Sequence, residues 1–164
     1  SVSFIMIFSV LLSCGEDDSN PSSDDLSGSW SLRSMTYEGN VTSILNGEEL
    51  AESPMSGEAS KISIVFNFEN NTLTSTGSMD VSVKYTDFSG VDFSYPLTGA
   101  ELSGTYIRNG NSLEINSLTS KIKAEIVTLT DTELVLNFER EYKLSTTGFE
   151  NISNETGVMR FTNN

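Results

Sequence analysis

Apolar and polar residues alternate one for one along much of the chain from Leu26 onward. Successive side chains of a β-strand point to opposite faces, so a period of two predicts strands with one buried face. Gly77, in the middle of the longest run, predicts a bulge or sharp bend, the device that lets a sheet curl. This run covers residues 73–85, and its predicted inward face is Leu73, Ser75, Gly77, Met79, Val81, Val83 and Tyr85.

Turn signals separate this run from the other predicted strands. Asn70-Asn71 follows an alternating run that begins at Ile62, and Asn109-Gly110 joins two further short runs. Asn and Gly both adopt left-handed backbone geometry readily, which suits tight hairpins. Counting the terminal segments 29–37 and 158–162, about eight or nine strands follow one another, with no convincing amphipathic helix longer than two turns.

The fold class predicted from this pattern is all-β. An up-and-down antiparallel barrel is favoured, because closure removes the exposed edges that such a row of strands would otherwise leave. A two-sheet sandwich is the alternative. Pro96 indicates an edge strand or a strand end, because proline cannot donate a hydrogen bond to a neighbouring strand.

The composition excludes several kinds of partner and site. With 23 acidic and 9 basic residues the formal net charge is −14, so the chain is expected to repel nucleic-acid phosphates and anionic membrane surfaces. It has no histidine and one cysteine, which are poor material for a metal site or an internal disulfide. We therefore predict no nucleic-acid partner, no metal and no cofactor. No acid stands out on an interior face, so no catalytic residue is assigned and the chain is not expected to be an enzyme.

The first 25 residues do not follow the strand pattern. Residues 2–12 are apolar apart from serines, a run too short for a bilayer span of about 20 residues but suited to a signal-peptide core of about 7–15. Leu11-Leu12-Ser13-Cys14 then resembles the lipobox of bacterial lipoproteins, which implies lipid attachment to Cys14 and cleavage just before it. We expect residues 1–13 to be a signal peptide, 14–25 a lipidated tether and 26–164 the folded domain. Without an initial Met or a basic segment, further residues are expected to precede Ser1.

Acidic residues follow the cysteine directly. Glu16, Asp17 and Asp18 resemble the export signal of surface lipoproteins common in Bacteroidota, which implies the outer face of the outer membrane. A periplasm-facing anchor is the alternative. Residues 15–25 contain no large apolar side chain, so this stretch is expected to be a solvated tether that holds the domain clear of the lipid. The membrane is thus an expected partner through the lipid on Cys14.

Several motifs in the predicted strands resemble one family. Leu26-Ser27-Gly28-Ser29-Trp30-Ser31-Leu32 is similar to the Gly-x-Trp opening of lipocalins, and more closely to the start of lipocalin-like domains in bacterial lipoproteins. The stretches 66–78, 103–113 and 126–136 resemble the same family. The resemblance implies a small calyx-shaped barrel and does not imply an enzyme. It also implies a structural pair at the barrel bottom, with Arg160 of the last strand lying across Trp30; a core Trp30 with Arg160 in solvent is the alternative.

A candidate cavity is assigned to Tyr85, Phe93, Tyr95, Phe138, Arg140 and Tyr142. The aromatic members can line a cavity or simply form the core of a small barrel. Arg140 falls on the apolar face when counted by twos from Leu134. It can pair with an inward acid, meet an anionic ligand, or lie in solvent where its strand outgrows the barrel, and we favour the solvated position.

Residues 41–61 form the longest segment without a clear strand pattern. They lie where lipocalins keep the loop that covers the barrel mouth, so this segment is interpreted as a lid or as an insertion packed on the barrel. Two functions follow. The first is a lipid-anchored module that binds a small, partly apolar ligand. The second is a filled barrel that serves as an interaction or accessory subunit of a cell-envelope or nutrient-uptake complex.

Overall fold

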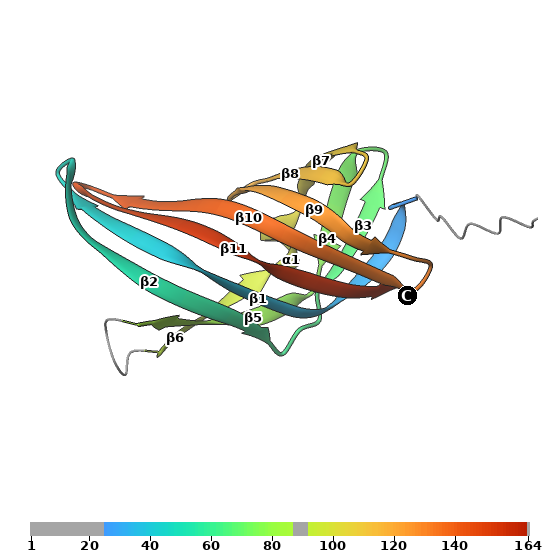
Figure 1. Cartoon of the computed structure of the whole chain (residues 1–164), viewed down its shortest axis with the longest axis horizontal. Helices are drawn as coiled ribbons and strands as arrows, with labels where there is room; N and C mark the ends of the chain where they lie inside the picture. Colours follow the sequence, from blue (N-terminus) through green and yellow to red (C-terminus); the bar gives the residue numbers. More distant parts are fainter. Residues whose placement is uncertain (1–24, 87–91, 164) are drawn as a thin grey trace, which may run out of the picture.

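The computed structural model describes residues 25–86 and 92–163, which form an all-β body (Figure 1). Cys14, Glu16, Asp17 and Asp18 lie outside the described residues. The elements, in chain order, are β1 (Gly28–Leu45), β2 (Glu48–Ser60), β3 (Val65–Glu69), β4 (Thr72–Thr76), β5 (Ser78–Tyr85), β6 (Asp92–Thr98), α1 (Gly99–Leu102), β7 (Gly104–Asn109), β8 (Ser112–Ser117), β9 (Lys121–Leu129), β10 (Glu133–Thr146) and β11 (Phe149–Asn163).

Eight of these strands close into an antiparallel barrel, in the order β1, β3, β4, β7, β8, β9, β10, β11 and back to β1. This closure confirms the predicted barrel and rules out the sandwich. β1 is long enough to have two neighbours on one side, because its residues 28–31 pair with β3 and its residues 36–45 pair with β2. The strands β2, β5 and β6 therefore extend the wall beyond the closed ring. β6 is the outermost of them, which confirms the edge position predicted from Pro96.

The closed end of the barrel is filled by large apolar side chains. Phe66 packs on Phe161 with ring centroids 5.1 Å apart, and Phe68 packs edge-on against Tyr106 at 5.1 Å. Burying one such side chain contributes about 1.5–3 kcal/mol, so this cluster is a main source of stability. The alternation predicted for residues 73–85 is confirmed, since its buried members are Leu73, Ser75, Met79, Val81 and Val83.

Gly77 divides one long predicted strand into β4 and β5. Its φ of +83° lies in the left-handed region, and a Cβ at this position would lie 2.2 Å from the carbonyl oxygen of Ser63. The bend lets β4 pair with β3 and β7 while β5 pairs with β2 and β6. The bend predicted at this glycine is confirmed. The turn predicted at Asn70-Asn71 is confirmed as well, with φ values of 48° and 62°.

The interpretation of residues 41–61 as a lid or a packed insertion is wrong, because this segment forms the end of β1 and all of β2. The hairpin β1–β2 and the hairpin β10–β11 run side by side and extend beyond the other strands at one end of the molecule (Figure 1). Their tips are joined by a hydrogen bond from the backbone N–H of Asn46 to the carbonyl oxygen of Gly148 (2.7 Å). Residues 48–52 of β2 are exposed, and the inward positions that follow include Ser53 and Gly57, so the sequence lacks the apolar alternation that marks a half-buried strand.

Pro54 is accommodated in β2 because it lies just past the end of the β2–β5 ladder, which begins at the pair Met55–Tyr85. Its carbonyl oxygen accepts a hydrogen bond from the backbone N–H of Thr86 (3.0 Å). The position without an N–H group therefore falls where no strand hydrogen bond is needed.

The helix α1 is a single turn that connects β6 to β7. The Oε2 atom of Glu101 accepts hydrogen bonds from the backbone N–H and the hydroxyl of Thr98, at 2.8 and 2.7 Å. In the part of the chain that the structure describes, no helix combines the length and the apolar composition needed to cross a membrane.

Candidate functional site

A cavity of about 310 Å³ lies between the wall formed by β2, β5 and β6 and the wall formed by β10, β11 and β1. The helix α1 and the turn between β8 and β9 contribute Leu102 and Thr119 to its lining. Aliphatic side chains from several strands cover part of the surface: Val41, Met55, Val83 and Leu97. Five aromatic side chains cover another part: Tyr37, Tyr85, Phe93, Tyr95 and Tyr142. Apolar walls of this kind with a few convergent polar groups are typical of small-molecule sites.

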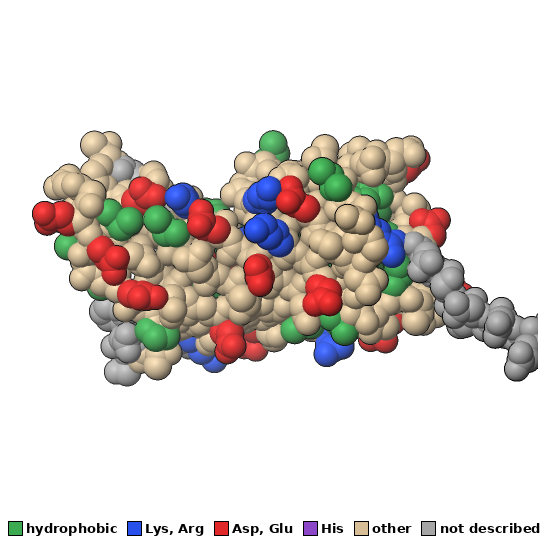
Figure 2. Space-filling view, turned by 45° about the horizontal axis from the view of Figure 1, so that its top comes forward, with side chains coloured by type: hydrophobic (Ala, Val, Ile, Leu, Met, Phe, Trp, Pro, Cys, Tyr) green, Lys and Arg blue, Asp and Glu red, His purple; other side chains and the backbone are tan. Residues whose placement is uncertain are grey.

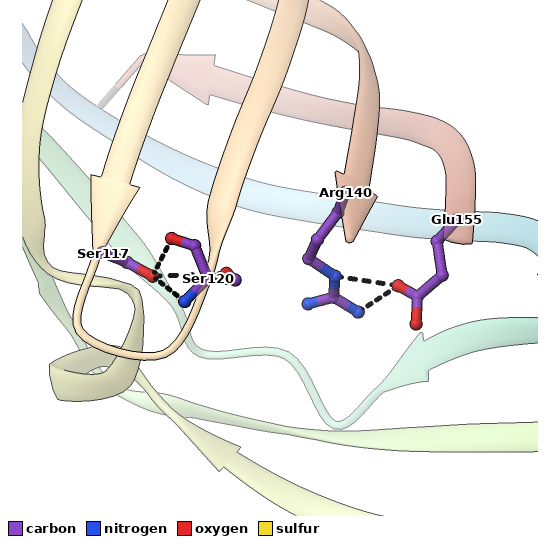
Figure 3. Close-up of polar contacts among 4 residues, drawn as sticks. All are labelled: Ser117, Ser120, Arg140 and Glu155. Atoms are coloured by element: carbon purple, nitrogen blue, oxygen red, sulfur yellow. Dashed lines mark hydrogen bonds and ion pairs between the residues drawn. The ribbon is translucent and has the colours of Figure 1, made fainter. Parts of the chain in front are cut away.

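An ion pair between Arg140 and Glu155 lies in this cavity lining. The Nε atom of Arg140 donates a hydrogen bond to Oε2 of Glu155 at 2.8 Å, and Nη2 donates to the same oxygen. The two residues are directly opposite each other in the β10–β11 ladder, so their side chains leave the sheet on the same face (Figure 3). Only 10% of the Arg140 side chain and 5% of the Glu155 side chain is exposed. The favoured expectation of a solvated Arg140 is therefore wrong, and pairing with an inward acid is the observed alternative.

The pair is held charged by mutual attraction. Burial by itself lowers the pKa of the Arg140 guanidinium, but the charge and hydrogen bonding of Glu155, with smaller effects of Tyr95 and Tyr37, leave that pKa above its ordinary value. Arg140 is therefore a permanent cation. A buried ion pair of this kind is often no more stabilising than two apolar side chains of similar size. A contribution to stability therefore does not by itself explain why this pair lies in the cavity.

Each partner of the pair retains an unused polar atom. Figure 3 shows the second carboxylate oxygen of Glu155, Oε1, directed away from Arg140, and one terminal nitrogen of Arg140, Nη1, directed away from Glu155. Within residues 25–86 and 92–163, neither atom has a hydrogen-bond partner, and neither is sealed from solvent. One ion pair of the cavity lining therefore carries both a free donor and a free acceptor.

Tyr37 forms part of the cavity next to the ion pair. The guanidinium carbon of Arg140 lies 5.8 Å from the centre of the Tyr37 ring, within the range of a cation–π interaction. The ring also covers Gly57 of β2, where a Cβ would lie 2.2 Å from Cζ of Tyr37. Burial raises the pKa of Tyr37 far above its ordinary value and also raises the pKa of Tyr95. Both hydroxyls are therefore neutral at ordinary pH, and the Tyr37 hydroxyl donates a hydrogen bond to that of Tyr95.

The structure brings together five of the six residues assigned to a candidate cavity: Tyr85, Phe93, Tyr95, Arg140 and Tyr142. Phe93 and Tyr142 are at the rim, with 55% and 36% of their surface exposed. Phe138 does not line the cavity; it is buried next to Gly157 in the core. The sequence analysis missed Glu155, although counting by twos back from Phe161 through Met159 and Gly157 places it on the inward face.

The predicted pair of Trp30 and Arg160 is not formed. Trp30 is buried at the closed end, where its indole N–H donates to the carbonyl oxygen of Leu26 at 3.0 Å. Arg160 is exposed, because it lies between the buried residues Met159 and Phe161 and so points to the opposite face of β11. The observed arrangement is the alternative, a core Trp30 with Arg160 in solvent.

A second hollow of about 900 Å³ crosses the outside of β5, β2, β1, β11, β10 and β9. Its charged side chains are Glu38, Glu58, Lys84, Lys123, Glu125 and Glu139. Figure 2 shows acidic side chains spread over the face in view, with basic ones among them. In the described ranges no group of three or more Asp, Glu, Cys or His side chains is placed to hold a metal ion.

Comparison with known proteins places this geometry in a family. A family model described as a lipocalin-like domain matches residues 26–136, and no characterised protein or solved structure matches the chain. This fold is typically a non-catalytic binding fold. Because the match covers more than half of the 164 residues, the chain belongs to the lipocalin-like domain family.

Proposed function

We propose that the barrel binds a small, partly apolar ligand in the cavity that contains Arg140 and Glu155. The observation that carries this proposal is a space of about 310 Å³ lined by aromatic and aliphatic side chains around one buried ion pair. That volume is at the lower end of the range for small-molecule sites, so the ligand is compact. The proposal assigns binding rather than catalysis, because Arg140 neutralises Glu155, the one buried carboxylate among residues 25–86 and 92–163.

We further propose that the barrel is anchored to the outer membrane through lipid on Cys14 and faces the cell exterior. The support is the lipobox-like stretch and the acids Glu16, Asp17 and Asp18 that follow it. β1 begins at the closed end of the barrel (Figure 1), whereas the cavity is bordered by the later parts of β1 and β10 and by the first half of β11. A tether that joins at Leu26 therefore leaves the cavity directed away from the membrane.

Native mass spectrometry of the protein released from its own host's envelope tests ligand binding. We expect a small-molecule adduct that disappears on unfolding. Ser153→Phe fills the cavity, because Ser153 lies half-buried in its lining, and should abolish the adduct. Val127→Phe is the matched control, since Val127 is 54% exposed and does not line the cavity. An adduct that survives in Ser153→Phe would contradict the proposed site.

The second candidate function is an interaction subunit with no small ligand. It is favoured by apolar side chains at the hairpin tips, where the paired residues Leu45 and Phe149 are 43% and 37% exposed and Leu50 is 58% exposed. A clean ligand-free mass for the native protein, together with loss of a co-purifying envelope protein in Leu50→Ser, would support this candidate over ligand binding.

Fractionation and protease shaving of whole cells test the anchor. Cys14→Ala should move the protein from the membrane fraction to the soluble fraction, because no lipid can be attached. Replacing Glu16, Asp17 and Asp18 with Ala should protect the protein from protease added to intact cells. Equal shaving of the variant and the parent would show that these acids are not an export signal.

A further inference from the structure

We propose that the cavity selects a ligand that is neutral and carries a hydrogen-bond donor next to an acceptor on its polar end, as a primary amide does. This inference rests on the proposed function, because it names the chemistry of the ligand bound at the same site. It excludes a free carboxylate, the head group of a fatty acid, as the preferred polar end.

The first argument is the direction of the unused atoms. Both hydrogen bonds from Arg140 reach the same oxygen of Glu155, Oε2. Glu155 Oε1 is therefore left to accept and Arg140 Nη1 is left to donate (Figure 3), and both residues belong to the cavity lining. A ligand group that offers one N–H and one carbonyl oxygen satisfies both atoms at once. A carboxylate satisfies only the arginine and brings its own charge against Glu155.

The second argument is the charge of the cavity. Arg140 and Glu155 cancel each other, and the other acid in the lining, Glu101, is held by hydrogen bonds that lower its pKa and keep it ionised. A neutral ligand leaves this balance unchanged. An anion adds a charge that no second cation among the described lining residues can neutralise, and burying an uncompensated charge is strongly unfavourable.

The third argument comes from the walls. The hydroxyls of Tyr37 and Tyr95 are neutral, because burial raises the pKa of each phenol; the Tyr37 hydroxyl donates to that of Tyr95, which leaves the Tyr95 proton for a ligand. Phe93 and Tyr95 have ring centroids 5.9 Å apart and form one aromatic side of the cavity. A compact ring with an amide at one end fits this combination of an apolar wall and a polar floor.

The test uses four probes of nearly equal shape: benzamide, benzoate, benzamidinium and toluene. Each is titrated into the purified full-length protein by NMR, with millimolar affinities expected for ligands of this size. We expect benzamide to bind about tenfold or more tightly than benzoate or toluene, and to shift resonances of cavity residues. Benzoate binding as tightly as benzamide would overturn the proposal, and so would benzamidinium binding more tightly.

Two charge variants make the test specific. Glu155→Gln removes the negative charge and leaves Arg140 unpaired, so preference should shift from benzamide toward benzoate. Arg140→Met combined with Glu155→Leu removes both charges; it avoids an unpaired buried charge and should fold. In that double variant benzamide should lose its advantage over toluene. A benzamide preference that is unchanged in both variants would show that the ion pair does not determine which ligand binds.

The outcomes also separate this inference from the proposed function. If toluene binds in the cavity as tightly as benzamide, the ligand class is wrong while the cavity remains a binding site. If none of the four probes shifts a cavity residue, ligand binding and the ligand class both fail.

Discussion

Arg140 of β10 and Glu155 of β11 face each other across one rung of the barrel wall, with Nε of the arginine 2.8 Å from Oε2 of the glutamate. The pair links the two long strands at the depth where the packed core gives way to the cavity. It is therefore both a structural element and a chemical feature of the site.

Removing one partner of this pair should destabilise the fold strongly. Glu155→Gln leaves the Arg140 charge buried without a counterion, so we expect the free energy of unfolding to fall by about 3–5 kcal/mol. The double replacement by Met and Leu should lie within about 1–2 kcal/mol of the parent, because well-packed apolar residues can substitute for a buried pair. Urea unfolding of the three proteins measures both differences. Equal losses in the single and double variants would indicate that packing, not charge, governs this position.

Gly57 should not tolerate a side chain. A Cβ there would lie 2.2 Å from the Tyr37 ring, so Gly57→Ala forces the ring to move and should lower stability by about 1–3 kcal/mol. Because Tyr37 lines the cavity, ligand binding should weaken as well. Ser56→Ala, on the exposed face of the same strand, is the control and should change stability by less than about 0.5 kcal/mol. Thermal unfolding reports the first effect, and titration with ligand reports the second.

Trp30 and Arg160 should behave as independent residues. Trp30→Phe removes a buried hydrogen bond to Leu26 and part of the closed-end core, so we expect a loss of about 1–3 kcal/mol. Arg160→Ala should change stability by less than about 0.5 kcal/mol, because its side chain is in solvent. In a double-mutant cycle the coupling energy should be near zero. A coupling energy of about 1 kcal/mol or more would indicate that the Arg160 guanidinium contacts the Trp30 indole ring.

Stability should fall at alkaline pH in a way that depends on Tyr37. Burial raises the pKa of Tyr37 from its ordinary value of 10.0, so the folded protein holds the phenol proton after the unfolded chain has lost it. The contribution of Tyr37 is therefore fully present below about pH 10 and declines as the pH rises above that value. The urea midpoint should drop less steeply between pH 10 and about 12 in Tyr37→Phe than in the parent. Parallel curves for the two proteins would contradict this assignment.

The alternation of residues determined the all-β class, the inward face of residues 73–85 and the turns on either side. The bend at Gly77 and the turn at Asn70-Asn71 could be predicted from the sequence, because a positive φ is a local preference of those residue types. The outward position of Arg160 could be predicted in the same way, because it lies between the inward-facing residues Met159 and Phe161. The family resemblance implied a pair of Arg160 with Trp30, which this local alternation already opposed. The lipobox-like stretch remains a prediction from the sequence alone.

Tertiary structure decided the rest. β2 alternates in burial from Ser53 onward, but its inward positions include Ser53, Gly57 and Ala59, so the residue types show no apolar alternation and only pairing with β1 and β5 makes it a strand. The inward position of Tyr37 depends on the irregularity between Leu32 and Ser34, which moves the buried positions of β1 from even to odd numbers. Arg140 finds Glu155 because the β10–β11 register sets them opposite each other. Residue types and their spacing encode which face each side chain occupies, but the partner it meets there is set by strand register and barrel closure, which depend on the whole chain.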